Sequence, residues 1–226
     1  MKYTIFLLVF CLGLGKSVAQ SKKCMVNETF AKPLNPKKWA VELEQKGKAL
    51  VSVESGKLVL DTKGGVTVWL KQKLKGNYKI SYKRKVIMEG GENDRLSDLN
   101  QFWLAEDPHN ANLFTRKGKF EEYDSLRLYY VGMGGNYNST TRFRKYQGNG
   151  ERTLLAEKNE PATLLAANKE YQIEIIVKDH TTSFWVDGQC LFIQTDTNLP
   201  KEGYFGFRST YARQAIWDFC VERLRE

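Results

Sequence analysis

The sequence is poor in residues that bind metals, and it carries no nucleotide-binding motif. It has 2 histidines and 4 cysteines, and no Cys-x-x-Cys pair, so a zinc site is not expected. Residues 132–137, GMGGNY, lack the third glycine of a dinucleotide fingerprint, and no helical pattern follows them. No run of like charges is long enough to indicate a general nucleic-acid partner. We expect no required cofactor, and a structural calcium ion on backbone carbonyls stays open.

Long hydrophobic runs are also missing, apart from one near the N-terminus that is too short to span a bilayer. Residues 5–14 are apolar, Lys2 precedes them, and a small-residue cleavage signal ends at Ala19. This pattern predicts a signal peptide at residues 1–19, cleaved near Ala19, and one domain over residues 20–226. We expect the mature protein in the periplasm or outside the cell, as a monomer without a transmembrane segment.

Basic residues outnumber acidic ones along the whole chain. Lysine and arginine total 35 against 26 acidic residues, which gives a formal net charge of +9. An exported basic domain is better suited to an acidic polysaccharide or an envelope surface than to nucleic acid. The expected partner is therefore an acidic oligosaccharide.

Three cysteines remain in the mature chain, an odd number for an oxidising compartment. Cys24 and Cys220 flank the two ends of the domain, and the ends of closed sandwiches often lie side by side. We predict a disulfide between Cys24 and Cys220, and we expect Cys190 to be a buried thiol.

Period-two alternation and turn residues dominate, and no long helical stripe is present. Many short strands separated by turn signals are typical of a β-sandwich. Residues 162–168, ATLLAAN, are the one hint of a helical turn. The expected strands lie at residues 57–61, 66–70, 78–82, 99–105, 125–131, 171–177, 183–186, 189–194, 203–208 and 215–221.

Both ends of the domain carry signatures of a known fold. The opening signature runs from Thr29-Phe30 to Glu42, and the closing one is GYFGFRSTYARQAIWDF at residues 203–219. Over nearly all of the mature chain, the sequence resembles the concanavalin A-like jelly rolls of bacterial polysaccharide-utilisation systems. The resemblance implies an all-β fold, a jelly-roll sandwich of two antiparallel sheets. Residues 93–103 and 129–146 look like one family within that group, a domain of unknown function.

The resemblance does not select a reaction. Relatives by fold include alginate, glucuronan and ulvan lyases, laminarinase-type hydrolases and a family associated with keto-disaccharide cleavage. Retaining glycosidases of this fold carry Glu-x-Asp-x-x-Glu on one strand. Glu92 and Asp94 begin that pattern, but Ser97 stands where the second glutamate belongs, which argues against such a hydrolase. Asp94 and Asp98 stay open as functional residues or as ion-pair partners of Arg95.

Elimination from a uronate needs other groups, and the sequence supplies them. The substrate carboxylate must be neutralised by Arg, Asn or Gln, while a tyrosine or histidine acts as base, acid or both. The stretch 125–146 combines strand halves, three glycines, amides, hydroxyls and basic residues, which suits a polar, anionic ligand; a glycine-rich hairpin with a solvated basic strand is the alternative. The predicted catalytic residues are Tyr129, His109, Arg208 and Arg142. The predicted substrate-binding residues are Asn100, Gln101, Trp103, Arg144, Asn136, Asn138, Tyr211 and Arg213.

Alternation along the central strand predicts which side chains face the site. If Leu126 and Leu128 face the core, Tyr130 does as well, which leaves Arg127 and Tyr129 on the open face. The same argument at the penultimate strand directs Phe205 and Phe207 inward and Arg208 outward. Gln101, Tyr129, Arg142 or Arg144, and Arg208 are therefore expected around one groove, with His109 at its rim.

The function predicted from these observations is that of a carbon–oxygen lyase acting on uronate-containing oligosaccharides, ulvan-type ones included. Such an enzyme either dehydrates an unsaturated oligosaccharide or cleaves the chain as a polysaccharide lyase. A glycoside hydrolase of a disaccharide is the alternative enzyme. A non-catalytic carbohydrate-binding module, with Trp69, Trp103 and Tyr129 as a stacking platform, is the alternative outside catalysis.

Overall fold

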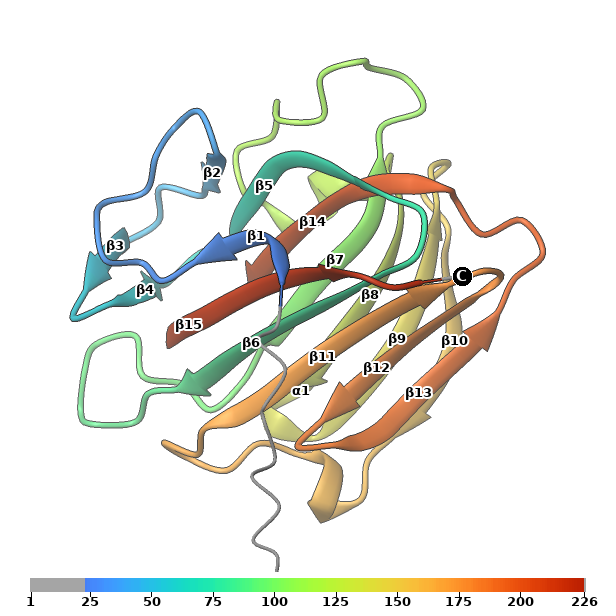
Figure 1. Cartoon of the computed structure of the whole chain (residues 1–226). Coiled ribbons are helices and arrows are strands. Elements are labelled where there is room, and N and C mark those ends of the chain that lie inside the picture. The colour runs from blue at the N-terminus through green and yellow to red at the C-terminus, as the bar shows by residue number, and fades with distance from the viewer. Residues whose placement is uncertain (1–22, 226) are drawn as a thin grey trace, which may run out of the picture.

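Antiparallel strand pairing accounts for most of the regular structure. The computed structural model describes residues 23–225, and their strands form two sheets that face each other, which confirms the predicted all-β jelly-roll sandwich (Figure 1). The signal peptide predicted at residues 1–19 lies outside the described residues. Within residues 23–225, no helix has the length and apolar character needed to cross a membrane.

One sheet has eight strands. Along it lie β13 (Gln189–Thr195), β12 (Thr181–Val186), β11 (Tyr171–Lys178), β6 (Tyr78–Val86), β15 (Ala212–Arg223), β4 (Lys57–Thr62) and β3 (Ala49–Glu54), and β1 (Cys24–Glu28) also pairs with β15.

The other sheet has seven strands. Their order is β10 (Arg152–Lys158), β9 (Thr140–Gln147), β8 (Arg127–Gly134), β7 (Leu99–Glu106), β14 (Glu202–Ser209), β5 (Val66–Lys75) and β2 (Trp39–Leu43). Short helical turns interrupt the strands at η1 (Phe120–Tyr123), α1 (Gly135–Asn138) and η2 (Pro161–Thr163), the last of which overlaps the expected helical turn.

Aromatic side chains from both sheets form the core between them. Phe205 and Phe207 of β14 point inward, as predicted, and the ring of Phe205 stacks 5.5 Å from that of Phe219 on β15. Tyr82 of β6 contacts Phe207 edge to face at 5.0 Å. Each such aromatic pair adds roughly 0.5–1.5 kcal/mol to the stabilisation from burial alone.

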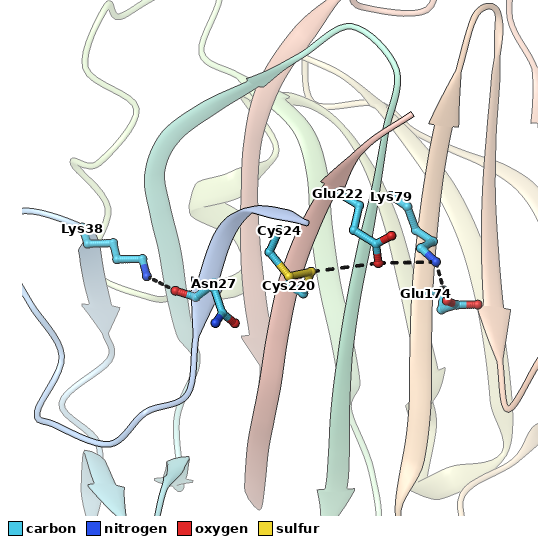
Figure 2. Close-up of a disulfide and its surroundings, with 7 residues drawn as sticks. All are labelled: Cys24, Asn27, Lys38, Lys79, Glu174, Cys220 and Glu222. Carbon is cyan, nitrogen blue, oxygen red and sulfur yellow. Dashed lines mark hydrogen bonds and ion pairs between the residues drawn. A yellow bond between two sulfur atoms is a disulfide. The ribbon is translucent and has the colours of Figure 1, made fainter. Parts of the chain in front are cut away.

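A disulfide joins the two ends of the domain. Cys24 and Cys220 are bonded, with Cα atoms 5.5 Å apart, within the range that disulfides need (Figure 2). The bond lies where β1 runs antiparallel to β15, and Glu28 pairs there with Phe219. It therefore links the first described strand to the last.

The expectation that Cys190 is buried is wrong. Cys190 lies on β13, the edge strand of the eight-stranded sheet, and it is an exposed free cysteine. The register explains the difference: Phe192 pairs with Phe184 and Cys190 with Trp185, which leaves Leu191 as an extra residue. This bulge breaks the alternation, so Cys190 does not share the inward direction of Phe192.

A long loop, residues 107–126, adds a second apolar layer on the outer face of the seven-stranded sheet. Leu113, Tyr123 and Leu126 of this loop pack against Trp69 and Phe102, which point away from the core between the sheets. The outer face of the sheet is consequently buried beneath the loop rather than fully open. This layer decides which part of the face remains accessible.

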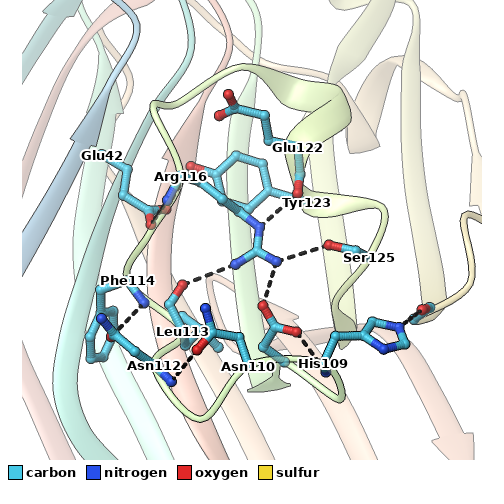
Figure 3. A network of polar contacts seen from close by, with 12 residues as sticks. Glu42, His109, Asn110, Asn112, Leu113, Phe114, Arg116, Glu122, Tyr123 and Ser125 are labelled. Atoms are coloured by element: carbon cyan, nitrogen blue, oxygen red, sulfur yellow. Dashed lines mark hydrogen bonds and ion pairs between the residues drawn. The ribbon is translucent and has the colours of Figure 1, made fainter.

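Arg116 holds the loop in shape (Figure 3). Its Nε donates to the carbonyl oxygen of Glu122 at 2.6 Å, and Nη1 donates to that of Leu113 at 3.0 Å. Nη2 donates to Asp107 at 2.7 Å and to the hydroxyl of Ser125 at 2.9 Å. One guanidinium thus ties together both ends and the middle of the loop.

Glu42 of β2 anchors the loop to the sheet. Its carboxylate accepts hydrogen bonds from the indole of Trp69 at 2.7 Å, the hydroxyl of Tyr123 at 2.8 Å and the backbone N–H of Arg116 at 2.8 Å. Burial raises the pKa of Glu42 above its ordinary value, against these three hydrogen bonds.

Candidate active site

The two adjacent tyrosines of β8 point to opposite faces of the sheet. Tyr130 belongs to the layer under the loop with Leu126 and Leu128, whereas Tyr129 lies in the core between the sheets. The prediction that Tyr129 occupies the open face is therefore wrong. The alternation itself was right, since Leu126, Leu128 and Tyr130 do share a side, but that side is the outer face and not the core.

Gln101 and Trp103 of β7 share the inward direction of Tyr129, so they also lie outside the predicted groove. Gln101 accepts from the hydroxyl of Tyr82 at 2.8 Å and donates to the carbonyl oxygen of Val131 at 2.7 Å. The indole of Trp103 donates to Thr182 on the opposite sheet at 2.8 Å. The bonds with Tyr82 and Thr182 join the two sheets, which is a structural role.

Tyr129 is also satisfied within the sandwich. Its hydroxyl donates to Asp196 at 2.5 Å, and Lys145 bonds the same carboxylate oxygen at 2.5 Å. Burial first, and then the hydrogen bond to Asp196, raise the pKa of Tyr129 well above its ordinary value. The arrangement fixes the end of β13 against β8 and β9.

A pocket of about 250 Å³ opens on the outer face, where β8 and β9 meet. Gly132 makes room for it, because a Cβ atom there would come within 2.1 Å of the hydroxyl of Tyr130 and 2.9 Å of Oδ1 of Asn100. The pocket is lined by Arg95, Asp98, Phe120, Tyr130, Gly132, Gly135, Asn136, Thr140, Arg142, Arg144 and Thr210.

Two of the arginines in this region have no acidic partner among residues 23–225. Arg142 pairs with Glu157 and Arg95 pairs with Asp98 at 2.8 Å. Arg144 has no salt bridge, and its Nε has no hydrogen-bond partner. Arg208 is fully buried, and its Nη1 donates only to neutral oxygens, such as the carbonyl of Gly118 at 2.6 Å.

Unpartnered polar atoms gather at the base of this face. Nε and Nη2 of Arg208 and both amide atoms of Asn100 are buried and have no hydrogen-bond partner among the described residues. Asn100 and Arg208 are directly opposite each other on β7 and β14. Buried polar groups are nearly always paired, so these atoms are the groups of this face that ordered water or a polar ligand would satisfy.

Arg84, a buried arginine of the eight-stranded sheet, bonds the backbones of Asn100 and Arg208 from the inner side of the sandwich. Arg84 of β6 donates to the carbonyl oxygens of Asn100 at 2.7 Å and Arg208 at 2.8 Å, and to the side chain of Gln214 at 2.7 Å. Burial lowers the pKa of Arg84 to about 10. The backbones that present Asn100 and Arg208 are thereby fixed relative to each other.

Apart from the arginines, the titratable side chains in the lining of the pocket are Asp98 and Tyr130. Burial raises the pKa of Asp98 above its ordinary value, and the ion pair with Arg95 opposes this only in part. Burial also raises the pKa of Tyr130, helped by Tyr146 and Asp98 and opposed by Arg144. Tyr130 is therefore a phenol at neutral pH, and the Asp98 carboxylate, when ionised, is a stronger base than an ordinary aspartate.

Tyr146 of β9 is a further buried tyrosine beside this group. Its ring lies 5.9 Å from that of Tyr130, and its hydroxyl has no hydrogen-bond partner among the described residues. Burial raises its pKa to about 12, while Arg152 and Arg144 oppose the shift.

The other predicted site residues are divided between the pocket and its surroundings. Asn136 lines the pocket, and Asn138 anchors the neighbouring turn by bonding the backbone of Leu165. Tyr211 contacts Arg95 at the rim, with the guanidinium carbon 5.3 Å from the ring centroid. Arg213 lies on β15 and is paired with Asp94 at 2.7 Å, outside the lining of the pocket.

His109 is not brought to this pocket. It lies in the loop after β7, where Nε2 contacts the carbonyl oxygen of Gly148 at 3.1 Å (Figure 3). Gly148 follows the end of β9, whereas the pocket adjoins the start of that strand. The expected position of His109 at the rim is therefore wrong, because the loop folds over the far end of the strand pair.

Of the residues predicted for the site, Asn136, Arg142 and Arg144 line this pocket, and Asn100 and Arg208 are buried in the same face of the sheet. Tyr130, which also lines the pocket, was not among the predicted site residues. The signal that could have identified Tyr130 was present in Gly132, two residues later on the same face of the same strand. A glycine in a strand marks a close approach, and the atom that approaches it is the hydroxyl of Tyr130.

Comparisons with known proteins agree with this fold. The model of a family described as a domain of unknown function, DUF6250, matches residues 60–219. A Bacillus subtilis protein of unknown function with a galectin-like fold has a TM-score of 0.72 at 17% identity, over 90% of this chain and 97% of its own. A Bacillus licheniformis beta-glucanase has a TM-score of 0.59 at 14% identity, over 91% of this chain and 100% of its own.

A carbohydrate-binding module from Bacillus subtilis, CBM66, is also similar, with a TM-score of 0.54 at 14% identity over 81% of this chain and 94% of its own. No curated protein is significantly similar in sequence. At these identities the likeness establishes the fold, which enzymes and binding modules share, and it leaves the reaction to be argued from the pocket.

Proposed function

This chain belongs to the DUF6250 family, and we propose that its pocket catalyses elimination across a carbon–oxygen bond of a uronate-containing oligosaccharide. The likeness to carbohydrate-active jelly rolls supports a role with sugars. The choice of elimination depends on the residues of the pocket. We further propose that the protein acts after export, in the periplasm or outside the cell.

The observation that carries the proposal is the set of unpaired cationic and amide groups beside Tyr130. Among residues 23–225, Arg144, Arg208 and Asn100 have buried atoms without partners, and neither arginine forms a salt bridge with an acidic residue. A uronate carboxylate in the pocket would pair with Arg144, which lines it, and Asn100 and Arg208, buried in the same face of the sheet, add donors and positive charge behind it. Binding it there withdraws charge from the carboxylate and makes the hydrogen on the neighbouring carbon more acidic.

The two remaining groups supply the proton transfers. The Asp98 carboxylate, made more basic by burial, takes the proton from the carbon next to the substrate carboxylate. The released electron pair forms the carbon–carbon double bond as the neighbouring carbon–oxygen bond breaks. The phenol of Tyr130 protonates the departing oxygen, which leaves as water or as the hydroxyl of the remaining chain.

Hydrolysis is supported less well by the same pocket. The two-carboxylate route needs an acid and a second carboxylate that acts as base or nucleophile. Asp98 is the one carboxylate among the residues that line the pocket, and it is paired with Arg95. A second carboxylate would have to come from outside the lining.

Product mass tests the proposal. The purified mature protein is incubated with saturated and unsaturated uronate oligosaccharides, ulvan-type ones included. Chain cleavage with no water gained indicates a polysaccharide lyase, and loss of one water with unchanged chain length indicates a dehydratase. Gain of one water would replace elimination by hydrolysis, and binding with no change in mass would indicate a carbohydrate-binding module.

A further inference from the structure

An exposed tyrosine lies at the rim of the pocket, on the turn between β8 and β9. Tyr137 is 83% exposed, the most exposed of the large hydrophobic residues that lie on the surface of residues 23–225. Its neighbour Asn136 lines the pocket. Single exposed apolar residues are ordinary, so exposure alone assigns no role to Tyr137.

The backbone of this turn is what sets Tyr137 apart. Gly134, Asn136, Tyr137 and Asn138 all have left-handed conformations, with φ of 70°, 49°, 58° and 61°. Glycine and asparagine tolerate this region, but tyrosine does not favour it, and such a residue costs on the order of 1 kcal/mol or more. An asparagine at position 137 would form the same turn more easily.

The turn is fixed in this conformation by specific bonds. The Asn138 side chain donates to the carbonyl oxygen of Leu165 at 2.9 Å and accepts from its N–H at 2.8 Å. The hydroxyl of Ser139 donates to the carbonyl oxygen of Asn136 at 2.7 Å. Tyr137 is therefore held at a fixed place beside the pocket.

Arg95 connects Tyr137 to the lining of the pocket. Its guanidinium carbon lies 4.5 Å from the ring centroid of Tyr137 and 5.3 Å from that of Tyr211, and Nη1 is paired with Asp98. The cation supports one part of the Tyr137 ring. The large exposed fraction shows that much of the ring is still free for contact with another group.

We propose that Tyr137 is a stacking platform for the sugar unit next to the one that enters the pocket. The inference rests on the proposed function, because it takes the pocket as the site of the reacting uronate. A rigid aromatic ring presents apolar area at little entropic cost, and the polar hydroxyl keeps the platform soluble. Tyr137 therefore favours substrates of two or more units over a single uronate unit.

Calorimetry of glucuronate and of an oligoglucuronate with four units tests this, in a Tyr130→Phe background that slows turnover. Tyr137→Asn is expected to weaken binding of the tetrasaccharide about five- to tenfold and that of the single unit less than about twofold. Tyr137→Phe keeps the ring and retains affinity. Ile193→Asn, at an exposed position on β13, is the matched control and changes neither affinity.

The Tyr137→Asn variant also keeps or raises the melting temperature, because asparagine accepts the left-handed backbone. Equal losses for the two lengths, or no loss for the tetrasaccharide, would overturn the platform and leave the proposed function intact. Failure of the Tyr130→Phe protein to bind either the single unit or the tetrasaccharide would overturn both.

Discussion

Replacing each of the two adjacent tyrosines of β8 separates catalysis from stability. Tyr130→Phe removes the phenol proposed to protonate the leaving oxygen, and we expect kcat to fall by about 10²–10⁴-fold. Tyr129→Phe removes the hydrogen bond to Asp196 in the sandwich. Because the acceptor is charged, we expect the free energy of unfolding to fall by about 1.5–3 kcal/mol, with kcat changed less than about threefold.

The variant Gly132→Ala tests the role of the Tyr130 hydroxyl by displacing it instead of removing it. The added Cβ would lie 2.1 Å from the hydroxyl of Tyr130 and 2.7 Å from the ring carbon that bears it, so the tip of the side chain has to move by an ångström or more. Displacement of a reacting group by about 1 Å can cost on the order of 10²-fold in rate. The overpacking itself costs about 1–3 kcal/mol of stability.

The two changes should not be additive in rate. Once Tyr130→Phe has removed the hydroxyl, Gly132→Ala has no proton donor left to displace, so the double variant should be about as slow as Tyr130→Phe alone. Rates are measured as formation of the unsaturated product or loss of water by mass, and stability by urea unfolding. The reasoning is refuted if Gly132→Ala keeps kcat within about threefold, or if Tyr129→Phe loses as much activity as Tyr130→Phe.

Three further outcomes are expected. Replacing Cys24 and Cys220 together by serine opens a cross-link with a sequence separation of 196 residues, and the free energy of unfolding should fall by about 4 kcal/mol in urea titrations; an unchanged midpoint would contradict the stabilising role. Although burial opposes it, bonds from Lys145 and Tyr129 hold the pKa of Asp196 below its ordinary value, so this stabilisation is present above about pH 4 and is lost as pH falls through the lower native pKa. The stability gap between wild type and Asp196→Asn should therefore narrow as pH falls below about 4, and a constant gap would rule out this linkage. Burial raises the pKa of Asp98, so the protonated carboxyl stabilises the fold at low pH, and this stabilisation is lost as pH rises through the native pKa. Asp98→Asn should therefore unfold at a higher temperature than wild type at pH 7 while losing activity. A lower melting temperature with activity retained would make Asp98 structural.

Local chemistry made much of the fold predictable. Alternating apolar residues and turn signals determine strands wherever one side of a strand must be buried, as in β11, where Tyr171, Ile173, Ile175 and Val177 are buried and the residues between them are not. Such patterns predicted the sandwich class and the inward direction of Phe205 and Phe207. They also placed Arg208 on the opposite face.

The candidate site was predictable only in part, because β8 is buried on both faces. Its residues after Arg127 are all buried, so period two shows which side chains share a face but not which face is the core. Loop 107–126 supplies the second apolar layer, and its position on the sheet depends on Glu42, which bonds the backbone of Arg116 and the hydroxyl of Tyr123, 74 and 81 residues away in sequence. No local pattern contains that information.

The sequence by itself determined most of the strands, their alternation, the basic character of the chain and the residue types that could bind an acidic sugar, but β1, β2, β3 and β10 were not predicted. Tertiary structure decided that Tyr130 rather than Tyr129 adjoins the pocket, and that His109 lies at the far end of β8 and β9. It also brought Asn100, Arg144 and Arg208 to one face from three strands. The physical reason is the sequence separation of the contacts involved. Alternation is determined by residues that are neighbours in the chain, whereas the site is formed by contacts between strands that only the packed sandwich brings together.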